Sequence, residues 1–212
     1  EIKMKKLLIW GAGDQGLVTL ECALAMNAYE QIDFLEIKEK GSRKIINHTV
    51  FKESEFDKVV KLYDEVIVAT GSNDLREEKI KMLLAFGIPL ATIVHPTALI
   101  SSSAKIGSGT TILANVIINI NTKVGIGCIV NNGAIIEHDC MVGNYVNICP
   151  KFAMAGHSSI GYKSYLGIGS TVIDDIRIGN RVTVGAGAVV VSNISDNIVA
   201  IGVPAKKMLV DK

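Results

Sequence analysis

The sequence is poor in several features, and each shortage argues against a class of protein. The 22 Lys and Arg residues nearly balance the 21 Asp and Glu residues, giving a net charge of +1, so neither nucleic acid nor a membrane surface is a predicted partner. No apolar run reaches the roughly 18 residues that a membrane-spanning helix needs. The four cysteines, Cys22, Cys128, Cys140 and Cys149, form no CxxC pair, which argues against a zinc knuckle or a disulfide framework.

The start of the chain also lacks the pattern of a signal peptide, because a charged stub leads into one short apolar segment. We therefore expect a cytoplasmic protein. Aromatic residues make up only 5% of the 212 residues, whereas 20 are glycine and 49% are hydrophobic. A chain of this composition can bury a sizeable core, and the scarcity of aromatics beside abundant glycine suggests a repetitive architecture.

A six-residue repeat fills the second half of the chain. It gives 17 consecutive apolar positions, namely Val94, Ile100, Ile106, Ile112, Ile118, Val124, Val130, Ile136, Val142, Ile148, Met154, Ile160, Leu166, Val172, Ile178, Val184 and Val190. Six is an even number, so a strand alternation keeps these side chains on one side in every repeat. Glycine often follows the apolar residue, where we expect it to relieve a turn. A small or branched residue usually comes four places after it, as expected for a narrow stacked core.

This repeat predicts a parallel β-helix over residues 94–195, followed by a tail over 196–212. The pattern resembles the left-handed hexapeptide transferases, in which three hexads make one triangular coil. The resemblance implies between five and six coils. The repeat could also serve only as a scaffold, but the tail contains Gly202-Val203-Pro204-Ala205-Lys206, a run in which hexapeptide acyltransferases commonly end.

Residues 4–93 are predicted to form a small Rossmann-like domain. Apolar strands are expected at 6–10, 31–37, 65–70 and 90–94, with helices ending near Asn27 and Phe86. Their alternation indicates a parallel α/β sheet.

The segment from Gly11 to Gly16 matches the G-x-G-x-x-G pattern of nucleotide-binding turns. Glu36 lies 20 residues after Gly16, where it could accept a hydrogen bond from a ribose hydroxyl. The domain is too short for a full dinucleotide fold, so a mononucleotide, such as the nucleotide end of a nucleotide-linked sugar, fits better. Asp14 suits a helix N-cap, but its charge opposes a phosphate there. Alternatively, the glycines serve only close packing.

Of the four histidines, we expect His48 and His95 to be structural and His138 to be functional. Asp139 follows His138 directly, and a carboxylate beside an imidazole orients it for general-base chemistry. The alternative is a solvated turn histidine. His138 and His157 are separated by one coil plus one residue. They could share a zinc ion, but a third ligand is missing from the sequence, so no metal is expected.

Taken together, these motifs resemble the bacterial sugar acetyltransferases that include sialic acid O-acetyltransferase and the UDP-4-amino-sugar N-acetyltransferase of the bacillosamine pathway. The resemblance covers nearly the whole chain. It rests on Trp10–Gly13 with Gly16–Val18, Ala69–Asn73 with Arg76, Ile136–Cys140 with Val142-Gly143, Leu166–Ile168, and Gly202–Lys206. It implies a homotrimer in which the small domain holds the nucleotide sugar and acetyl-CoA lies between adjacent β-helices.

The resemblance also implies roles for individual residues. His138 matches the catalytic base, Asp139 its acidic neighbour, and Asn147 the place of a second histidine near the thioester. The implied coenzyme A contacts are Gly156, His157, Gly167, Ile168, Ala186, Gly187, Pro204 and Lys206. The implied substrate contacts are Gly11, Gly13, Asp14, Gln15, Glu36, Ile37, Gly71 and Ser72. The chain departs from the family at Asn147, at Asp14-Gln15, where Gly-His is common, and at Glu36-Ile37, where one acid of a pair remains.

The implied reaction is direct acetyl transfer from acetyl-CoA to the 4-amino group of a UDP-linked 2-acetamido-4-amino-2,4,6-trideoxy sugar. No Cys or Ser is placed with a base as an obvious nucleophile, which argues against a covalent intermediate. The alternatives are O-acetylation of sialic acid or another sugar, N-acetylation of a dTDP- or GDP-linked amino sugar, and a trimeric nucleotide-binding assembly module without catalysis.

Overall fold

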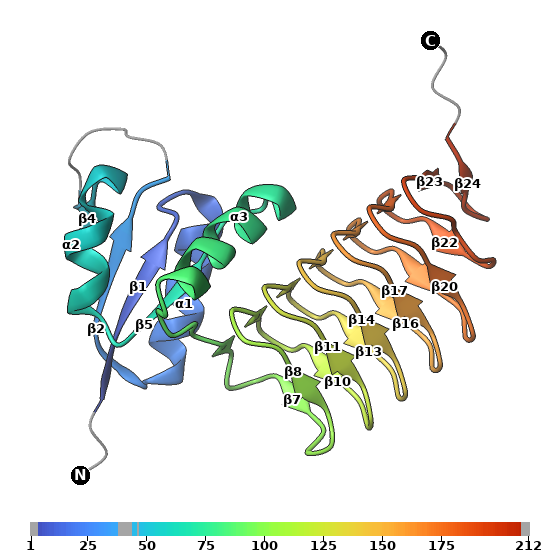
Figure 1. Cartoon of the computed structure of the whole chain (residues 1–212). Coiled ribbons are helices and arrows are strands. Elements are labelled where there is room, and N and C mark those ends of the chain that lie inside the picture. Colours follow the sequence, from blue (N-terminus) through green and yellow to red (C-terminus); the bar gives the residue numbers. More distant parts are fainter. Residues whose placement is uncertain (1–3, 38–43, 46, 209–212) are drawn as a thin grey trace. The chain divides into compact units, whose positions relative to one another are not determined.

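A computed structural model describes residues 4–37, 44–45 and 47–208. The chain divides between Pro96 and Thr97 into two compact units, coloured blue to green and green to red along the sequence in Figure 1. The division lies three residues later than the expected boundary after residue 93. Strand β6 (Ile93–Val94) packs against helix α1 (Asp14–Met26) of the first unit, which accounts for the difference.

The first unit is a small α/β domain built on one five-stranded sheet. Its strand order is β3-β4-β2-β1-β5, parallel except for the β3–β4 pair. The strands are β1 (Lys5–Trp10), β2 (Tyr29–Leu35), β3 (Lys44–Ile45), β4 (His48–Phe51) and β5 (Glu65–Val68), and the helices are α1 (Asp14–Met26), α2 (Phe56–Val59) and α3 (Asn73–Ala85). Short 3₁₀ turns cover Glu53–Glu55 and Val60–Leu62. Within the described ranges, no helix is both long and apolar enough to span a bilayer.

The central strand β1 explains why this unit folds as a parallel sheet. Leu7, Leu8, Ile9 and Trp10 are all fully buried, as expected for a central parallel strand that is covered on both faces. The strands expected at 6–10, 31–37 and 65–70 are present as β1, β2 and β5. The segment expected as a strand at 90–94 instead forms an isolated bridge from Leu90 to Val66, followed by β6. β3, β4 and α2 were not expected.

The second unit is a parallel β-helix whose strands are two residues long in every coil up to β22. Each strand pairs with the third strand after it, as in Ile118↔Ile136 and Val124↔Val142, so three hexads make one coil (Figure 1).

The strands of the β-helix form three faces. The first face carries β7 (Leu99–Ile100), β10 (Ile117–Ile118), β13 (Ile135–Ile136), β16 (Ala153–Met154), β19 (Thr171–Val172) and β22 (Val189–Val190). The second face carries β8 (Lys105–Ile106), β11 (Lys123–Val124), β14 (Met141–Val142), β17 (Ser159–Ile160) and β20 (Arg177–Ile178). The third face includes β9 (Thr111–Ile112), β12 (Ile129–Val130), β15 (Asn147–Ile148), β18 (Tyr165–Leu166) and β21 (Thr183–Val184).

The coils continue beyond residue 195, so the expected limit of the β-helix was too early. Strand β23 (Val199–Ile201) pairs with β21, and β24 (Lys206–Lys207) pairs with β23 antiparallel. The pair Thr183↔Val199 and the bridge Ile178↔Ile194 each join positions that are two residues closer in the sequence than a full coil. The last coil is therefore shorter. The six-residue spacing of apolar residues is lost from the sequence there, although the coil still stacks on the one before it.

Each six-residue repeat has two positions that contribute to the core: the apolar residue and the small residue four places after it. On the first face, the inward apolar side chains from Ile118 to Val190, such as Ile136 and Met154, are at most 1% exposed. The small residues four places later add hydrogen bonds between coils. Thr110 Oγ1 donates to the Gly125 carbonyl at 2.9 Å and accepts from the Cys128 N–H at 3.0 Å. Buried hydroxyls thus satisfy backbone groups at the turns.

The glycines that follow the apolar positions allow close stacking of the coils, whereas we had expected them to relieve the turn. Gly161 does not have a positive φ, but a Cβ on it would lie 2.5 Å from the Gly179 carbonyl carbon of the next coil. The positive φ values fall two places later in each turn, for example at Lys163. These residues are therefore glycine because the neighbouring backbone leaves no room for a side chain.

Candidate active site

A cavity of about 590 Å³ lies in the first unit at the carboxyl ends of its parallel strands. All eight residues expected to contact the substrate line it, together with four that were not expected: Ala12, Ala69, Thr70 and Leu75. The end of β1, the end of β2 and the turn between β5 and α3 each contribute to its wall. In open α/β sheets, ligands bind outside the carboxyl ends of the strands.

The three motif glycines have different reasons to be glycine. A Cβ on Gly11 would collide with the Ala69 carbonyl oxygen, and one on Gly16 would collide with the Gly11 carbonyl oxygen. Gly11 also has a φ of +131°, which side chains rarely adopt. A Cβ on Gly13 would meet nothing within 4 Å. Packing therefore explains the first and last glycines, whereas only Gly13 leaves room for an occupant of the cavity.

Two helices begin at this cavity. The N-cap of α1 is Gly13 and not Asp14, which is instead the first helical residue, so our expectation of an Asp14 N-cap was wrong. The N-cap of α3 is Ser72, whose Oγ accepts a hydrogen bond from the Leu75 N–H at 3.3 Å. Free N–H groups at such helix ends favour anionic ligands, while the Asp14 carboxylate opposes them.

The fully buried Arg76 fixes the turn between β5 and α3. Its guanidinium donates to the Thr70 carbonyl at 2.8 Å and to Asn73 Oδ1 at 2.6 Å. Across the cavity, Glu36 is only 3% exposed. The cavity therefore combines one rigid turn with one buried carboxylic residue, both of which can meet polar groups of a ligand.

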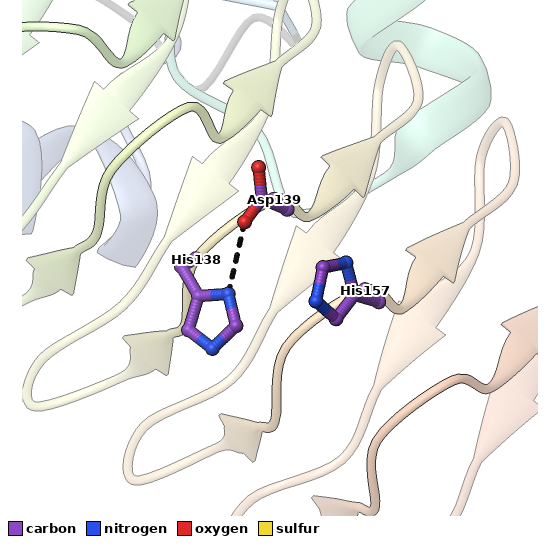
Figure 2. A group of neighbouring side chains, drawn as sticks. All are labelled: His138, Asp139 and His157. Carbon is purple, nitrogen blue, oxygen red and sulfur yellow. Dashed lines mark hydrogen bonds and ion pairs between the residues drawn. The ribbon is translucent and has the colours of Figure 1, made fainter.

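His138, Asp139 and His157 lie together at the turns that join the first face of the β-helix to the second (Figure 2). His138 Nδ1 lies 3.0 Å from Asp139 Oδ2, and the two side chains are 45% and 38% exposed. The His157 ring lies edge to face with the His138 ring, with centroids 5.1 Å apart. Residues 138 and 157 are neighbours because one coil plus one residue separates them.

The contact with Asp139 determines which nitrogen of His138 can act as a base. An ionised carboxylate only accepts hydrogen bonds, so in the neutral imidazole Nδ1 carries the proton and donates a hydrogen bond to Asp139. Nε2 then keeps its lone pair, and Figure 2 shows this nitrogen directed away from Asp139. Hydrogen bonds from His138 and Asn121 hold the pKa of Asp139 below its usual value, so the carboxylate stays ionised near neutral pH.

Gly156 lies directly against the imidazole. A Cβ on this buried residue would lie 2.5 Å from Cε1 and 2.7 Å from Nε2 of His138. Our expectation placed Gly156 among the coenzyme A contacts. The structure shows in addition that its lack of a side chain makes room for the ring of the candidate base.

The same three residues could also hold a metal ion, because one donor atom from each lies within 4.8 Å of the others. The carboxylate of Asp139 is therefore a candidate third donor that our sequence analysis did not count. A metal ion held here would take up both His138 and the Asp139 carboxylate that orients it. The two uses of the cluster therefore exclude each other.

The other residues expected near coenzyme A lie elsewhere on the β-helix. Gly167, Ile168, Ala186 and Gly187 occupy the turns before β19 and β22, at the opposite end of the first face from His138. Gly167 is buried by stacking against Ala186, whereas Ile168 is 53% exposed. Asn147 lies on β15 of the third face, so one chain does not bring Asn147 and His138 together. Pro204 and Lys206 are exposed at the end of the β-helix.

The sequence analysis missed Asn121, which contacts Asp139 from the preceding coil. The signal that could have found it is the coil length, because Asn121 precedes Asp139 by one full coil of three hexads. Thr70 and Leu75 were also missed as cavity residues. Thr70 lies within the Ala69–Asn73 motif but was given no role, and Leu75 lies outside every motif.

Known proteins share both units. A family model described as the PglD N-terminal domain matches residues 6–83. The structure is similar to the acetyltransferase domain of PglB from Neisseria gonorrhoeae FA1090, with a TM-score of 0.91 and 32% identity over 96% of this chain and 99% of that one. It is also similar to PerB from Caulobacter crescentus, solved in complex with CoA and GDP-perosamine, with a TM-score of 0.90 and 30% identity over 98% of each chain.

The chain belongs to the sugar acetyltransferases of the hexapeptide-repeat class. A curated relative, the GDP-perosamine N-acetyltransferase of Escherichia coli O157:H7, is 27% identical over 189 residues, which cover 84% of this chain and 82% of that protein. The fold is accordingly a small α/β domain followed by a left-handed β-helix. Membership in a class of acetyltransferases makes the protein an enzyme, which removes the alternative of an assembly module without catalysis.

Proposed function

We propose that this acetyltransferase transfers the acetyl group of acetyl-CoA to the 4-amino group of a nucleotide-linked amino sugar. The observation that carries the proposal is the imidazole of His138, which is bound by Asp139 through Nδ1 and free at Nε2. Such a group can take the proton of an attacking amine. Two related structures support the co-substrate, since the PglB domain was solved in complex with acetyl coenzyme A and PerB in complex with CoA.

The reaction runs as a direct transfer. The amine nitrogen attacks the thioester carbonyl carbon while His138 Nε2 takes one proton from it, and Asp139 stabilises the imidazolium that forms. Collapse of the tetrahedral intermediate breaks the carbon–sulfur bond. The thiolate of coenzyme A leaves and takes the proton back from His138, which restores the base. General-base catalysis of this kind is worth roughly 10²–10⁴-fold in rate.

The cavity of the first unit binds the nucleotide end of the acceptor in this proposal. Gly13 lets a ligand approach the backbone, the starts of α1 and α3 face its phosphates, and Glu36 meets a sugar hydroxyl. The first candidate is the UDP-linked 2-acetamido-4-amino-2,4,6-trideoxy sugar. The second is a GDP-linked sugar, favoured by two relatives whose names specify GDP-perosamine.

The proposed active form is a homotrimer with acetyl-CoA between adjacent β-helices. The positions of His138 and Asn147 on different faces support this form, since a neighbouring chain could complete a site that one chain leaves divided. Asn147 would then donate to the thioester carbonyl as its oxygen gains charge. Sedimentation of the protein as a species three times its 22.7 kDa mass tests the trimer, and a monomer that is active at assay concentration would refute it.

The deciding experiment measures coenzyme A released from acetyl-CoA with each of several acceptors. These are UDP-2-acetamido-4-amino-2,4,6-trideoxyglucose, GDP-perosamine, a dTDP-linked 4-amino sugar and sialic acid. His138→Ala and His138→Asn are assayed beside the wild type. We expect release with one nucleotide-linked amino sugar and a loss of roughly 10²–10⁴-fold in both variants. Release with sialic acid alone would overturn the choice of a nitrogen acceptor, and near-wild-type turnover of both variants would overturn the role of His138.

A further inference from the structure

Asn121 completes a chain of contacts that ends at the candidate base. Its Nδ2 donates to Asp139 Oδ1 at 3.0 Å, and the other carboxylate oxygen, Oδ2, lies 3.0 Å from His138 Nδ1. Each oxygen of the carboxylate therefore has its own partner. Two contacts on opposite oxygens fix the rotation of the carboxylate plane, which a single contact would leave free.

The backbone holds Asn121 in place for this contact. Its φ is +61°, close to the +56° of Asp139 one coil later, and asparagine is among the residues that tolerate this region. The Asn121 N–H donates to Ser103 Oγ at 2.9 Å. Asn121 thus rests on the preceding coil and holds Asp139 of the next.

Among the polar and titratable groups around Asp139, Asn121 supplies the second hydrogen bond to the carboxylate. His157 adds a favourable charge from the following coil when protonated, and together with the bonds from His138 and Asn121 it keeps the pKa of Asp139 low. Glu137 of the same turn is bound separately, by Asn119 Nδ2 at 3.0 Å. The Cys140 thiol is buried, and burial raises its pKa, so it adds no charge to the turn near neutral pH.

We propose that Asn121 is a positioning residue that orients the Asp139 carboxylate and thereby keeps the proton of neutral His138 on Nδ1 and the lone pair on Nε2. The effect on the imidazole is independent of the substrate. The effect on turnover rests on the proposed function.

The test replaces Asn121 by glycine, which removes the amide without strain because glycine accepts a positive φ. Asn115→Gly is the matched control. Asn115 is exposed, has a φ of +58°, and donates its N–H to the Thr97 hydroxyl of the preceding coil at 3.0 Å. It therefore repeats the backbone setting of Asn121 at a turn away from the histidines. Thermal melting should be nearly the same for the two variants.

Two readouts separate positioning from a merely structural role. The first is the ¹⁵N spectrum of labelled histidine near pH 8, assigned with His138→Asn, where Asn121→Gly should raise the population of His138 with its proton on Nε2. The second is steady-state kinetics. We expect kcat to fall about 3- to 10-fold, as for the loss of one ordinary hydrogen bond, with KM for both substrates unchanged. Asn115→Gly should match the wild type in both.

Asn121→Asp tests the donor itself, because aspartate has the same size and tolerates the same φ but cannot donate when ionised. Two carboxylates this close raise the pKa of at least one of them. The pair should then take up a proton at a higher pH than Asp139 does in the wild type, so this variant should lose more activity at pH 6 than at pH 8. An unchanged ¹⁵N spectrum in Asn121→Gly, or an equal loss of kcat in Asn115→Gly, would overturn the proposal. Wild type without activity toward any acceptor would count against the proposed function, while the ¹⁵N result would still decide the role of Asn121.

Discussion

Replacing Gly156 by alanine should disable the candidate base without unfolding the protein. The added Cβ would lie 2.5, 2.7 and 3.0 Å from three atoms of the His138 ring, whereas ordinary contacts begin at 3.4 Å. The backbone of Gly156 does not have a positive φ, so alanine adds no strain there. Because the obstacle is a side chain that is 45% exposed, the ring can give way by moving outward.

The size of the movement sets the expected loss. Relieving the shortest contact, from 2.5 Å to 3.4 Å, requires a shift of about 1 Å, and a misplacement of about 1 Å can cost roughly 10²-fold in rate. The shift also lengthens the 3.0 Å contact with Asp139. We therefore expect kcat to fall about 10²-fold, while an off-rotamer ring costs only about 0.5–1.5 kcal/mol of folding free energy.

The assay follows coenzyme A release under saturating acetyl-CoA and acceptor, together with thermal unfolding by circular dichroism. Asp174→Ala is the matched control, because Asp174 is the exposed residue at the equivalent place on the next coil. This variant places an alanine in the same part of a turn, away from the imidazole. If Gly156→Ala keeps kcat within threefold of the wild type with an unchanged melting temperature, then either catalysis does not depend on the position of the imidazole or His138 is not the base.

Three further predictions concern the cavity and the histidine cluster. Gly13→Ala should lower the free energy of unfolding by no more than about 1 kcal/mol, since its Cβ meets nothing within 4 Å and only the N-cap of α1 is weakened. It should raise KM for the nucleotide sugar, and a higher KM for acetyl-CoA alone would contradict this. Arg76→Ala should lower the free energy of unfolding by about 3 kcal/mol, because the substitution leaves a cavity and removes the hydrogen bond to the Thr70 carbonyl. A loss below about 1 kcal/mol in urea unfolding would show that the turn does not depend on Arg76. Treatment with EDTA should leave turnover unchanged and added Zn²⁺ should inhibit, because a metal in this cluster would take up His138 and the carboxylate that orients it. Activity lost to EDTA and restored by Zn²⁺ would contradict both.

The β-helix could be predicted from the sequence because its cause is local and repeated. An apolar residue at every sixth position has one simple structural explanation, and β7 to β22 confirm it. The last coil could not be predicted, because its pairs are two residues closer in the sequence than a full coil and a fixed step of six loses them. The expectation that glycines such as Gly161 relieve the turn was wrong for a related reason. The nearest neighbour of Gly161 is Gly179 of the next coil, a contact that no local pattern contains.

The sequence predicted the pair of His138 and Asp139, the proximity of His157, and eight of the residues that line the cavity. His138 and Asp139 are consecutive, so their contact follows from chemistry alone. Asn121 lies one coil before Asp139 and Gly156 one coil after His138, and their contacts follow only from the length of the coil. In the first unit, the glycine motif located the cavity, but it could not tell that Gly11 and Gly16 serve packing while Gly13 does not.

The stacking of coils gives this architecture a way to carry catalytic groups at little cost to its core. Asp139 and His157 occupy the turn position with positive φ, and both are exposed, so the apolar interior does not depend on their side chains. Ile136 and Met154, which precede these turns, are at most 1% exposed and fill the interior instead. The backbone aligns such turn residues once in every coil. A polar column can therefore be assembled from separate turns while the buried column beside it stays apolar.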